Sequence, residues 1–147
     1  MTSVAENFFV YGTLKRGQHR QDQWPRKPLS VRRAWTLGKL YDIGPYPALR
    51  PGEDRVAGQV WTIAAEDVAE TIRVLDWIEG TNQPKYPNEY DRVKIEVQYL
   101  DGSHASASAY IFANMEMLEL AEYLPPSIEV DGSHYSIWPD ESPWSPG

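Results

Sequence analysis

The sequence predicts a single α+β domain that contains more strand than helix. Several short segments alternate apolar and polar residues, a pattern typical of strands with one buried face, and only two segments have helical spacing. The chain has 147 residues, of which 41% are hydrophobic and 24% charged, values that match one globular domain of common size. We therefore treat residues 1–147 as one domain.

Three strands are expected in the first 63 residues. Residues 7–11 are a short apolar segment that stops at Gly12, residues 34–43 end at a Gly-Pro-Tyr-Pro cluster, and residues 56–63 alternate with period two. A glycine directly after a strand indicates that the backbone comes close to another group there. Gly12 is therefore a position of interest.

The clearest element is a β-hairpin over residues 90–113. Its first arm alternates apolar and polar residues, and Asp101-Gly102 is a favoured two-residue turn. Residues 115–124 then form a short amphipathic helix that ends at two prolines. Residues 137–147 are rich in Pro and Trp, and they either pack through their tryptophans or hang loose.

A longer helix is expected at residues 66–80, with Gly80 as its C-terminal cap. Its buried face is defined by three apolar residues at helical spacing, Val68, Ile72 and Leu75. Glu79 lies four residues beyond Leu75 on the same face. A carboxylate therefore occupies a position where the pattern calls for an apolar residue.

A Glu79 side chain that faces the core has a raised pKa for two reasons. Desolvation disfavours the charged carboxylate, and so does the negative end of the helix dipole in the last turn. Such a carboxyl group is suited to proton transfer near neutral pH. The alternative is a structural Glu79 at the rim of the core, paired with an arginine such as Arg92. Asp76 is expected near the edge of this face, in contact with solvent.

Charge and composition exclude several classes of function. The net charge of −7 argues against general affinity for nucleic acid or anionic membranes, and no apolar segment is long enough to span a membrane. The N-terminus lacks the basic start of a signal peptide, so a cytoplasmic location is expected. There is no cysteine, and His19, His104 and His134 are too scattered for a metal site.

Half of the basic residues lie between positions 15 and 33. These seven of the 14 are Lys15, Arg16, Arg20, Arg26, Lys27, Arg32 and Arg33. The stretch is a solvated loop, a nucleic-acid footprint together with nearby tryptophans, or a patch that attracts an anionic small substrate. The acidic composition and the lack of a nucleic-acid-binding motif disfavour the second interpretation.

Five sequence blocks occur in a characteristic order. They are FVYGTLKRG at 9–17, YPALRPG at 46–52, VAGQVWTI at 56–63, LDWIEG at 75–80 and YDR at 90–92. This order resembles the gamma-glutamylcyclotransferase-like superfamily, in particular its short branch, which includes gamma-glutamylamine cyclotransferases and AIG2-like proteins. The resemblance covers about residues 7–113 and leaves 114–147 as a C-terminal extension. It implies a small twisted mixed β-barrel with flanking helices.

The resemblance also implies a site. In this family the loop after the first strand holds the gamma-glutamyl group through its main chain, and a glutamate after Leu-Asp-x-x is the general acid and base. The corresponding residues here are Tyr11, Gly12, Thr13 and Leu14 for the loop, Glu79 for the acid and base, and Tyr90 as a further substrate-binding residue. Lys15 and Arg16, which follow the loop directly, are then expected near the mouth of the pocket.

The implied reaction needs neither a metal nor an organic cofactor. The α-amine of a small gamma-glutamyl compound attacks its own gamma-carbonyl, which closes the ring of 5-oxoproline and releases an amine. The alternative is a catalytically silent barrel that binds a small amino-acid-like ligand or a protein partner. The Leu-Asp-x-x-Glu motif that contains Glu79 favours the enzyme.

Overall fold

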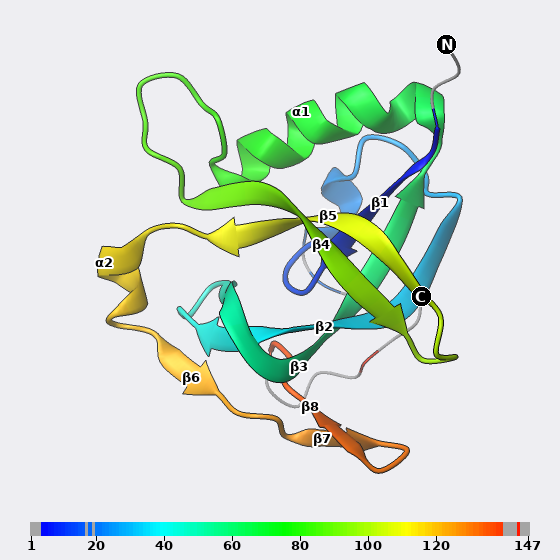
Figure 1. Ribbon diagram of the computed structural model, residues 1–147. Helices are drawn as coiled ribbons and strands as arrows, with labels where there is room; N and C mark the ends of the chain where they lie inside the picture. Colours follow the sequence, from blue (N-terminus) through cyan, green and yellow to red (C-terminus); the bar gives the residue numbers. More distant parts are fainter. Residues whose placement is uncertain (1–3, 17, 19, 140–143, 145–147) are drawn as a thin grey trace.

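A closed five-stranded β-barrel forms the centre of the computed structural model, which describes residues 4–16, 18, 20–139 and 144 (Figure 1). Its strands are β1 (Glu6–Val10), β2 (Ser30–Asp42), β3 (Pro47–Ile63), β4 (Tyr90–Tyr99) and β5 (His104–Phe112). They run in the order β3-β1-β5-β4-β2, and pairing of β2 with β3 closes the ring. The β1–β5 pair is parallel and the other pairs are antiparallel, so the mixed barrel expected from the resemblance is confirmed.

Strand β3 is much longer than the expected 56–63. It pairs with β2 from Asp42↔Pro47 to Ser30↔Thr62, and its second half also pairs with β1. Gly38 lies opposite Asp54, but the next residue, Lys39, lies opposite Arg50. Three residues of β3 therefore have no partner residue on β2. Those residues are Pro51, Gly52 and Glu53, which are typical of turns or charged and interrupt the alternation of apolar and polar residues. The first half of the strand therefore does not show the sequence pattern of a strand.

Strand β1 is apolar on both faces because both faces are buried. Phe9 lies in the apolar cluster that also contains Leu40, Val60 and Val97, whereas Phe8 and Val10 lie in a second cluster with residues of the helix α1. A strand buried on both sides reads as a continuous apolar run, which is what residues 8–10 show. Strand β1 therefore connects the two halves of the core.

Helix α1 (Val68–Glu79) confirms the longer expected helix and follows a 3₁₀ turn, η2 (Ala65–Asp67). Leu75 is fully buried in the second cluster, and Gly80 caps the helix in the left-handed conformation with φ 65°. A second 3₁₀ turn, η1 (Gln21–Gln23), lies between β1 and β2. No helix in the described part of the chain is long and apolar enough to cross a membrane.

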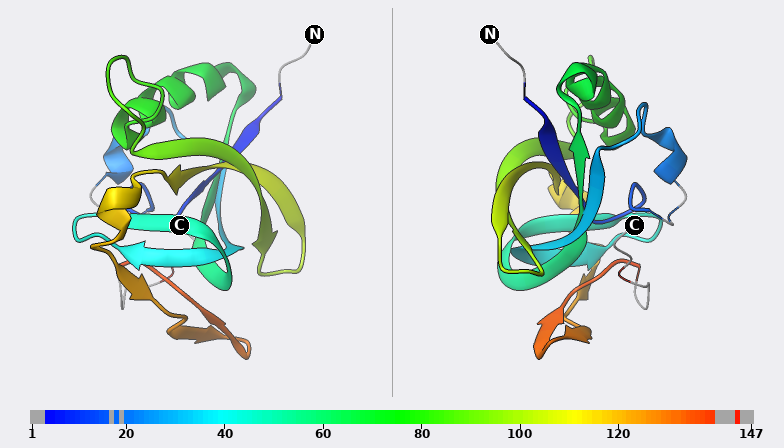
Figure 2. Two further views of the ribbon diagram at one scale, coloured as in Figure 1. Left: turned by 60° about the vertical axis from the view of Figure 1, so that its left-hand side comes forward. Right: turned by 90° about the vertical axis from the view of Figure 1, so that its right-hand side faces the viewer.

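The helix expected at 115–124 was mostly wrong. Helix α2 covers only Met115–Leu118, and β6 (Glu122–Leu124) pairs with β2 instead. Leu124 lies opposite Leu40, so hydrogen bonding at the free edge of β2 prevails over local helical preference. The strands β7 (Ile128–Val130) and β8 (Ser133–Tyr135) form a separate hairpin, on the side of the barrel away from α1 (Figure 2).

Two tryptophans of the C-terminal segment pack against the barrel. Trp138 belongs to the first apolar cluster, and the indole nitrogen of Trp144 donates a hydrogen bond of 2.8 Å to the carbonyl of Gly58. Packing through the tryptophans is therefore correct for these two residues. Residues 140–143 and 145–147 of that expectation lie outside the described residues.

Gly58→Ala is expected to destabilise the barrel. A Cβ at this position of β3 would lie 2.6 Å from the Val10 carbonyl oxygen and 2.6 Å from Cζ of Phe9, and the backbone oxygen cannot rotate away. Overpacking of this kind costs about 1–3 kcal/mol in the free energy of unfolding. Urea unfolding measures the change, and an unaltered midpoint would show that β1 and β3 do not approach this closely.

Candidate active site

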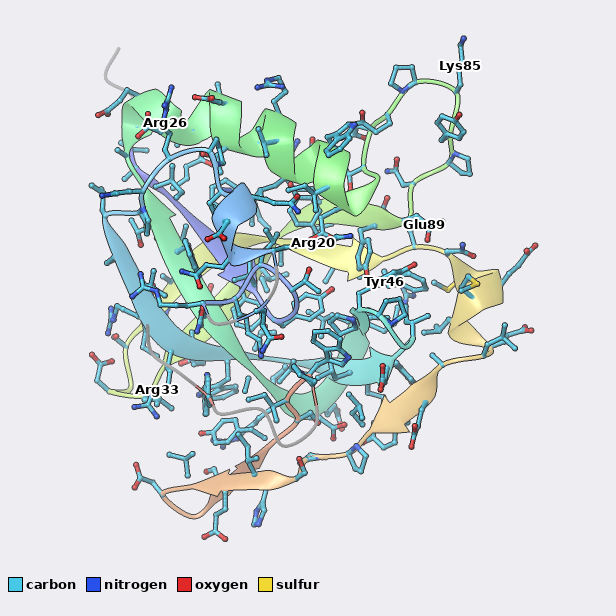
Figure 3. The ribbon with its side chains drawn as sticks, turned by 180° about the vertical axis from the view of Figure 1, so that it is seen from behind. Arg20, Arg26, Arg33, Tyr46, Lys85 and Glu89 are labelled. Atoms are coloured by element: carbon cyan, nitrogen blue, oxygen red, sulfur yellow. The ribbon has the colours of Figure 1, made fainter. Side chains whose placement is uncertain are left out.

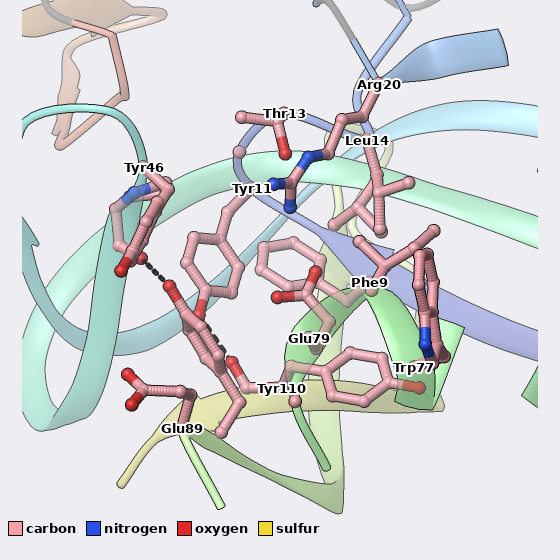
Figure 4. A pocket seen from close by; sticks show the side chains of 16 residues that line it. Phe9, Tyr11, Thr13, Leu14, Arg20, Tyr46, Trp77, Glu79, Glu89 and Tyr110 are labelled. Carbon is pink, nitrogen blue, oxygen red and sulfur yellow. Dashed lines mark hydrogen bonds between the residues drawn. The ribbon is translucent and has the colours of Figure 1, made fainter. Parts of the chain in front are cut away.

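The loop after β1, the C-terminal end of α1 and the start of β4 surround one cavity of about 270 Å³ (Figure 4). All six residues that the resemblance named line it: Tyr11, Gly12, Thr13, Leu14, Glu79 and Tyr90. More than 60 positions separate the loop from Glu79 in the sequence, and the barrel brings them together. The volume is just below the range of about 300–1,000 Å³ for drug-sized ligands, which suits a group of amino-acid size.

The carbonyl groups of the loop point to partners within the protein. Gly12 accepts a hydrogen bond from the Lys15 amide (3.1 Å), Thr13 from the Arg20 amide (2.9 Å) and Leu14 from the Trp24 indole (3.0 Å). Trp24 in turn stacks on Trp61 with ring centroids 4.3 Å apart. These bonds fix the main chain of the loop before any ligand arrives.

The amide N–H groups of the same three residues have no acceptor among the described residues. Gly12, Thr13 and Leu14 are all buried, and buried amide groups are nearly always hydrogen-bonded. The loop therefore offers donors where it borders the cavity. The need for glycine at position 12 is steric. A Cβ there would lie 2.8 Å from two ring carbons of Pro47, so only glycine lets the loop pass the start of β3.

Glu79 is the last residue of α1, and its side chain points into the cavity from the helix face that also carries Leu75 (Figure 4). Burial raises the pKa of its carboxyl group to about 7, and the nearby positive charge of Arg20 acts in the opposite direction. The carboxyl group therefore exchanges a proton near neutral pH. The pKa of Glu79 is thus raised, as its position on the buried face of the helix predicted.

Arg92 does not pair with Glu79, contrary to the structural alternative. Its Nε lies 2.9 Å from Asp76 Oδ1 and its Nη2 3.3 Å from Oδ2, and the Tyr110 hydroxyl donates to Oδ1 at 2.6 Å. The expectation that Asp76 contacts solvent was wrong, because only 8% of the residue is exposed. The partners come from β4 and β5, which the spacing along α1 does not reveal.

Two tyrosines form rigid neutral walls. The Tyr90 hydroxyl donates to the Pro47 carbonyl (2.6 Å), and the Tyr11 hydroxyl donates to the Tyr110 carbonyl. Burial raises the pKa of both phenols, and the Glu79 charge raises it further. Neither group loses its proton near neutral pH, so both line the cavity as neutral, hydrogen-bonded side chains.

The basic stretch does not form one patch, as the separate positions of Arg20, Arg26 and Arg33 in Figure 3 show. Arg20 lines the cavity, whereas Lys15 and Arg16, expected at its mouth, do not. Lys15 is buried beneath the loop, where its ammonium group donates to the Trp138 carbonyl and burial lowers its pKa to about 8. The Arg16 guanidinium lies over the Trp61 ring.

Several cavity residues were not anticipated from the sequence: Tyr46, Trp77, Glu89, Tyr110 and Arg20 in this role. Tyr46 and Trp77 lie inside recognised blocks, so their position gave a signal. Glu89 and Tyr110 gave none, because they reach the cavity only through the pairing of β4 with β5 and the adjoining bond from the Ala113 amide to the Glu89 carbonyl. Among the described residues, no group of His, Asp or Glu side chains is arranged to hold a metal ion.

Comparison with known proteins identifies the family. The family model described as "Gamma-glutamyl cyclotransferase, AIG2-like" matches residues 8–135. The chain belongs to this family. It is similar to the gamma-L-glutamyl-butirosin B gamma-glutamyl cyclotransferase of Niallia circulans, with 31% identity over 114 residues that cover 77% of this chain and 70% of the relative.

Solved structures agree with this assignment. An AIG2-like protein from Mus musculus is 26% identical, with a TM-score of 0.63 over 95% of this chain and 99% of the mouse chain. A protein from Arabidopsis thaliana shares the fold, with 23% identity and a TM-score of 0.58 over 78% and 72% of the two chains. The chain is thus an enzyme of the gamma-glutamyl cyclotransferase type with the barrel of that family.

Asp76→Asn is expected to lower the free energy of unfolding by about 1–3 kcal/mol. The amide cannot accept both hydrogen bonds from Arg92, so a partly buried guanidinium loses its counter-ion. Urea unfolding measures the loss. The exposed neighbour Asp91→Asn is the matched control, and equal effects in the two variants would contradict a structural role for the Asp76 pair.

Glu79 makes stability depend on pH. Because its pKa is higher in the folded state, the unfolded chain binds fewer protons between about pH 4.5 and 7, and the Glu79 contribution to stability falls as pH rises through this window. Glu79→Gln removes the effect, so the variant should gain on the wild type from pH 4 to pH 8 in urea unfolding. Glu66→Gln, the same change at an exposed position, is the control. A constant difference between Glu79→Gln and wild type would refute the raised pKa.

Proposed function

We propose that the protein converts the gamma-glutamyl group of a small amide or peptide to 5-oxoproline and releases the amine, with Glu79 as the general acid and base. The observation that carries this proposal is the joint position of two groups in one cavity. A carboxyl group with a pKa of about 7 faces a loop of amide donors that have no acceptor in the described chain.

Proton transfer starts at the α-amine of the substrate. An α-amino group has a pKa of about 7.7–8.0 and is mostly protonated at neutral pH, so it must lose a proton before it attacks. The Glu79 carboxylate accepts this proton. The amine nitrogen then forms a bond to the gamma-carbonyl carbon, and Glu79 passes the proton to the nitrogen of the departing amine as its bond to that carbon breaks and the carbonyl re-forms. The ring nitrogen, which still carries two hydrogens, gives one of them to the Glu79 carboxylate, and this second proton leaves with the released amine as its ammonium form. Matched pKa values make both transfers efficient, and such catalysis contributes about 10²–10⁴-fold.

The loop stabilises the charge that develops on the carbonyl oxygen. During the attack this oxygen becomes an oxyanion, and the free N–H groups of Gly12, Thr13 and Leu14 are fixed donors for it. Since the loop carbonyls are already bonded elsewhere, the donors need no reorganisation when the charge appears. Fixed donors stabilise a transition state for this reason.

The cavity also sets the conformation of the substrate. Nucleophile and electrophile belong to one molecule, so the enzyme has to hold the gamma-glutamyl chain in a bent form in which the amine meets the carbonyl. The aromatic walls of Tyr11, Tyr90 and Tyr110 are held by hydrogen bonds and exclude extended conformations. The leaving amine extends through the mouth beside Tyr46 and Trp77.

Incubation with a panel of gamma-glutamyl amines, amino acids and peptides should yield 5-oxoproline, detected by mass spectrometry. Glu79→Gln keeps the size of the side chain but removes the base, so turnover should fall by at least about 10²-fold while the fold is retained. Glu66→Gln is the matched control and should behave as wild type. No 5-oxoproline from any compound would contradict the reaction and favour a barrel that only binds ligands.

A further inference from the structure

Arg20 contributes a guanidinium group to the cavity, and the proposed chemistry does not use it. Its main chain is held on both sides, since its amide donates to Thr13 (2.9 Å) and its carbonyl accepts from Gln23 (3.0 Å). Trp24, just beyond, is locked in the aromatic stack on Trp61. The side chain therefore starts from a fixed point directly beside the loop.

The guanidinium has no hydrogen-bond or ion-pair partner in the described part of the chain. Other arginines show what a partner looks like here: Arg26 pairs with Glu70, Arg32 with Asp101 and Arg92 with Asp76. Arg20 points toward Glu79 across the cavity (Figure 4), yet no ion pair joins them. A planar fork of donors thus remains available to a ligand carboxylate.

The chemistry of the substrate supplies such a carboxylate at the right place. Every gamma-glutamyl group carries an α-carboxylate on the same carbon as the α-amine. When the amine lies at Glu79, the carboxylate lies one carbon away, within the cavity that Arg20 also lines. Without a cation, this carboxylate would meet the negative charges of Glu79 and Glu89 in the same cavity.

We propose that Arg20 binds the α-carboxylate of the gamma-glutamyl group and thereby restricts the enzyme to substrates that carry it. A 4-aminobutanoyl amide has the same amine and carbonyl but no α-carboxylate, and it is discriminated against at this position. This proposal rests on the proposed function, because it uses the substrate orientation in which the α-amine faces Glu79. It makes Arg20 a specificity-determining residue.

The test measures binding of the product, which is the same for every leaving amine. 5-Oxoproline keeps the α-carboxylate, and 5-oxoprolinamide is its neutral equivalent of nearly equal shape. NMR titration gives the dissociation constant of each for wild type, Arg20→Gln and the control Lys27→Gln, an exposed cation of the same stretch. Wild type and Lys27→Gln should prefer the carboxylate by about 10–100-fold, and Arg20→Gln should bind both ligands equally.

Two further measurements separate recognition from a structural effect. Raising the salt concentration should weaken binding of 5-oxoproline to wild type and leave 5-oxoprolinamide unaffected. Arg20→Lys keeps the charge without the fork and should retain part of the preference, so the test survives if Arg20→Gln does not fold. A preference that persists in Arg20→Gln, or a wild type with no preference, overturns the inference.

The binding test and the activity panel fail independently. A protein that forms 5-oxoproline but keeps its carboxylate preference without Arg20 overturns only the role of Arg20. A protein that binds 5-oxoproline through Arg20 but produces none from any gamma-glutamyl compound contradicts only the proposed reaction.

Discussion

The pairing of β2 with β3 is the constraint on which the rest of the structure depends. It closes the barrel, and closure brings the loop after β1 against Pro47, the first residue of β3. Gly12 is the residue that permits this contact. The Pro47 carbonyl in turn anchors the Tyr90 hydroxyl, so one end of β3 positions two walls of the cavity. An open sheet with the same strands would leave the loop and the end of α1 without a common cavity.

Two acidic residues of α1, three positions apart, differ in their environment because only one of them has ion-pair and hydrogen-bond partners on the neighbouring strands. Asp76 is held by Arg92 and Tyr110 from the neighbouring strands and serves the structure. Glu79 has no ion-pair partner among the described residues, and burial raises its pKa to about 7 although the positive charge of Arg20 acts in the opposite direction.

In the reaction that we propose, the loop and Glu79 have separate roles. Hydrogen bonds within the protein hold the loop carbonyls, and the amides, which have no acceptor among the described residues, would stabilise developing negative charge. In the proposed reaction Glu79 transfers the proton, and the positive charge of Arg20 lies close enough to act on its pKa. The charge of Arg20 also lowers the pKa of Glu79, so a ligand carboxylate that neutralises Arg20 couples binding to the proton affinity of the base.

The sequence by itself determined the strands of the hairpin, the helix α1, the placement of Glu79 and the family blocks, because these depend on local periodicity and on ordered short motifs. Tertiary structure alone decided the first half of β3 and the short elements α2 and β6. It also decided that Asp76 is buried and that Arg20, and not Lys15 or Arg16, lines the cavity. Each depends on a partner distant in the chain. Hydrogen bonding at a strand edge, or a counter-ion on another strand, decides the conformation or the burial of a residue. The residues next to it in the sequence carry no pattern that indicates this.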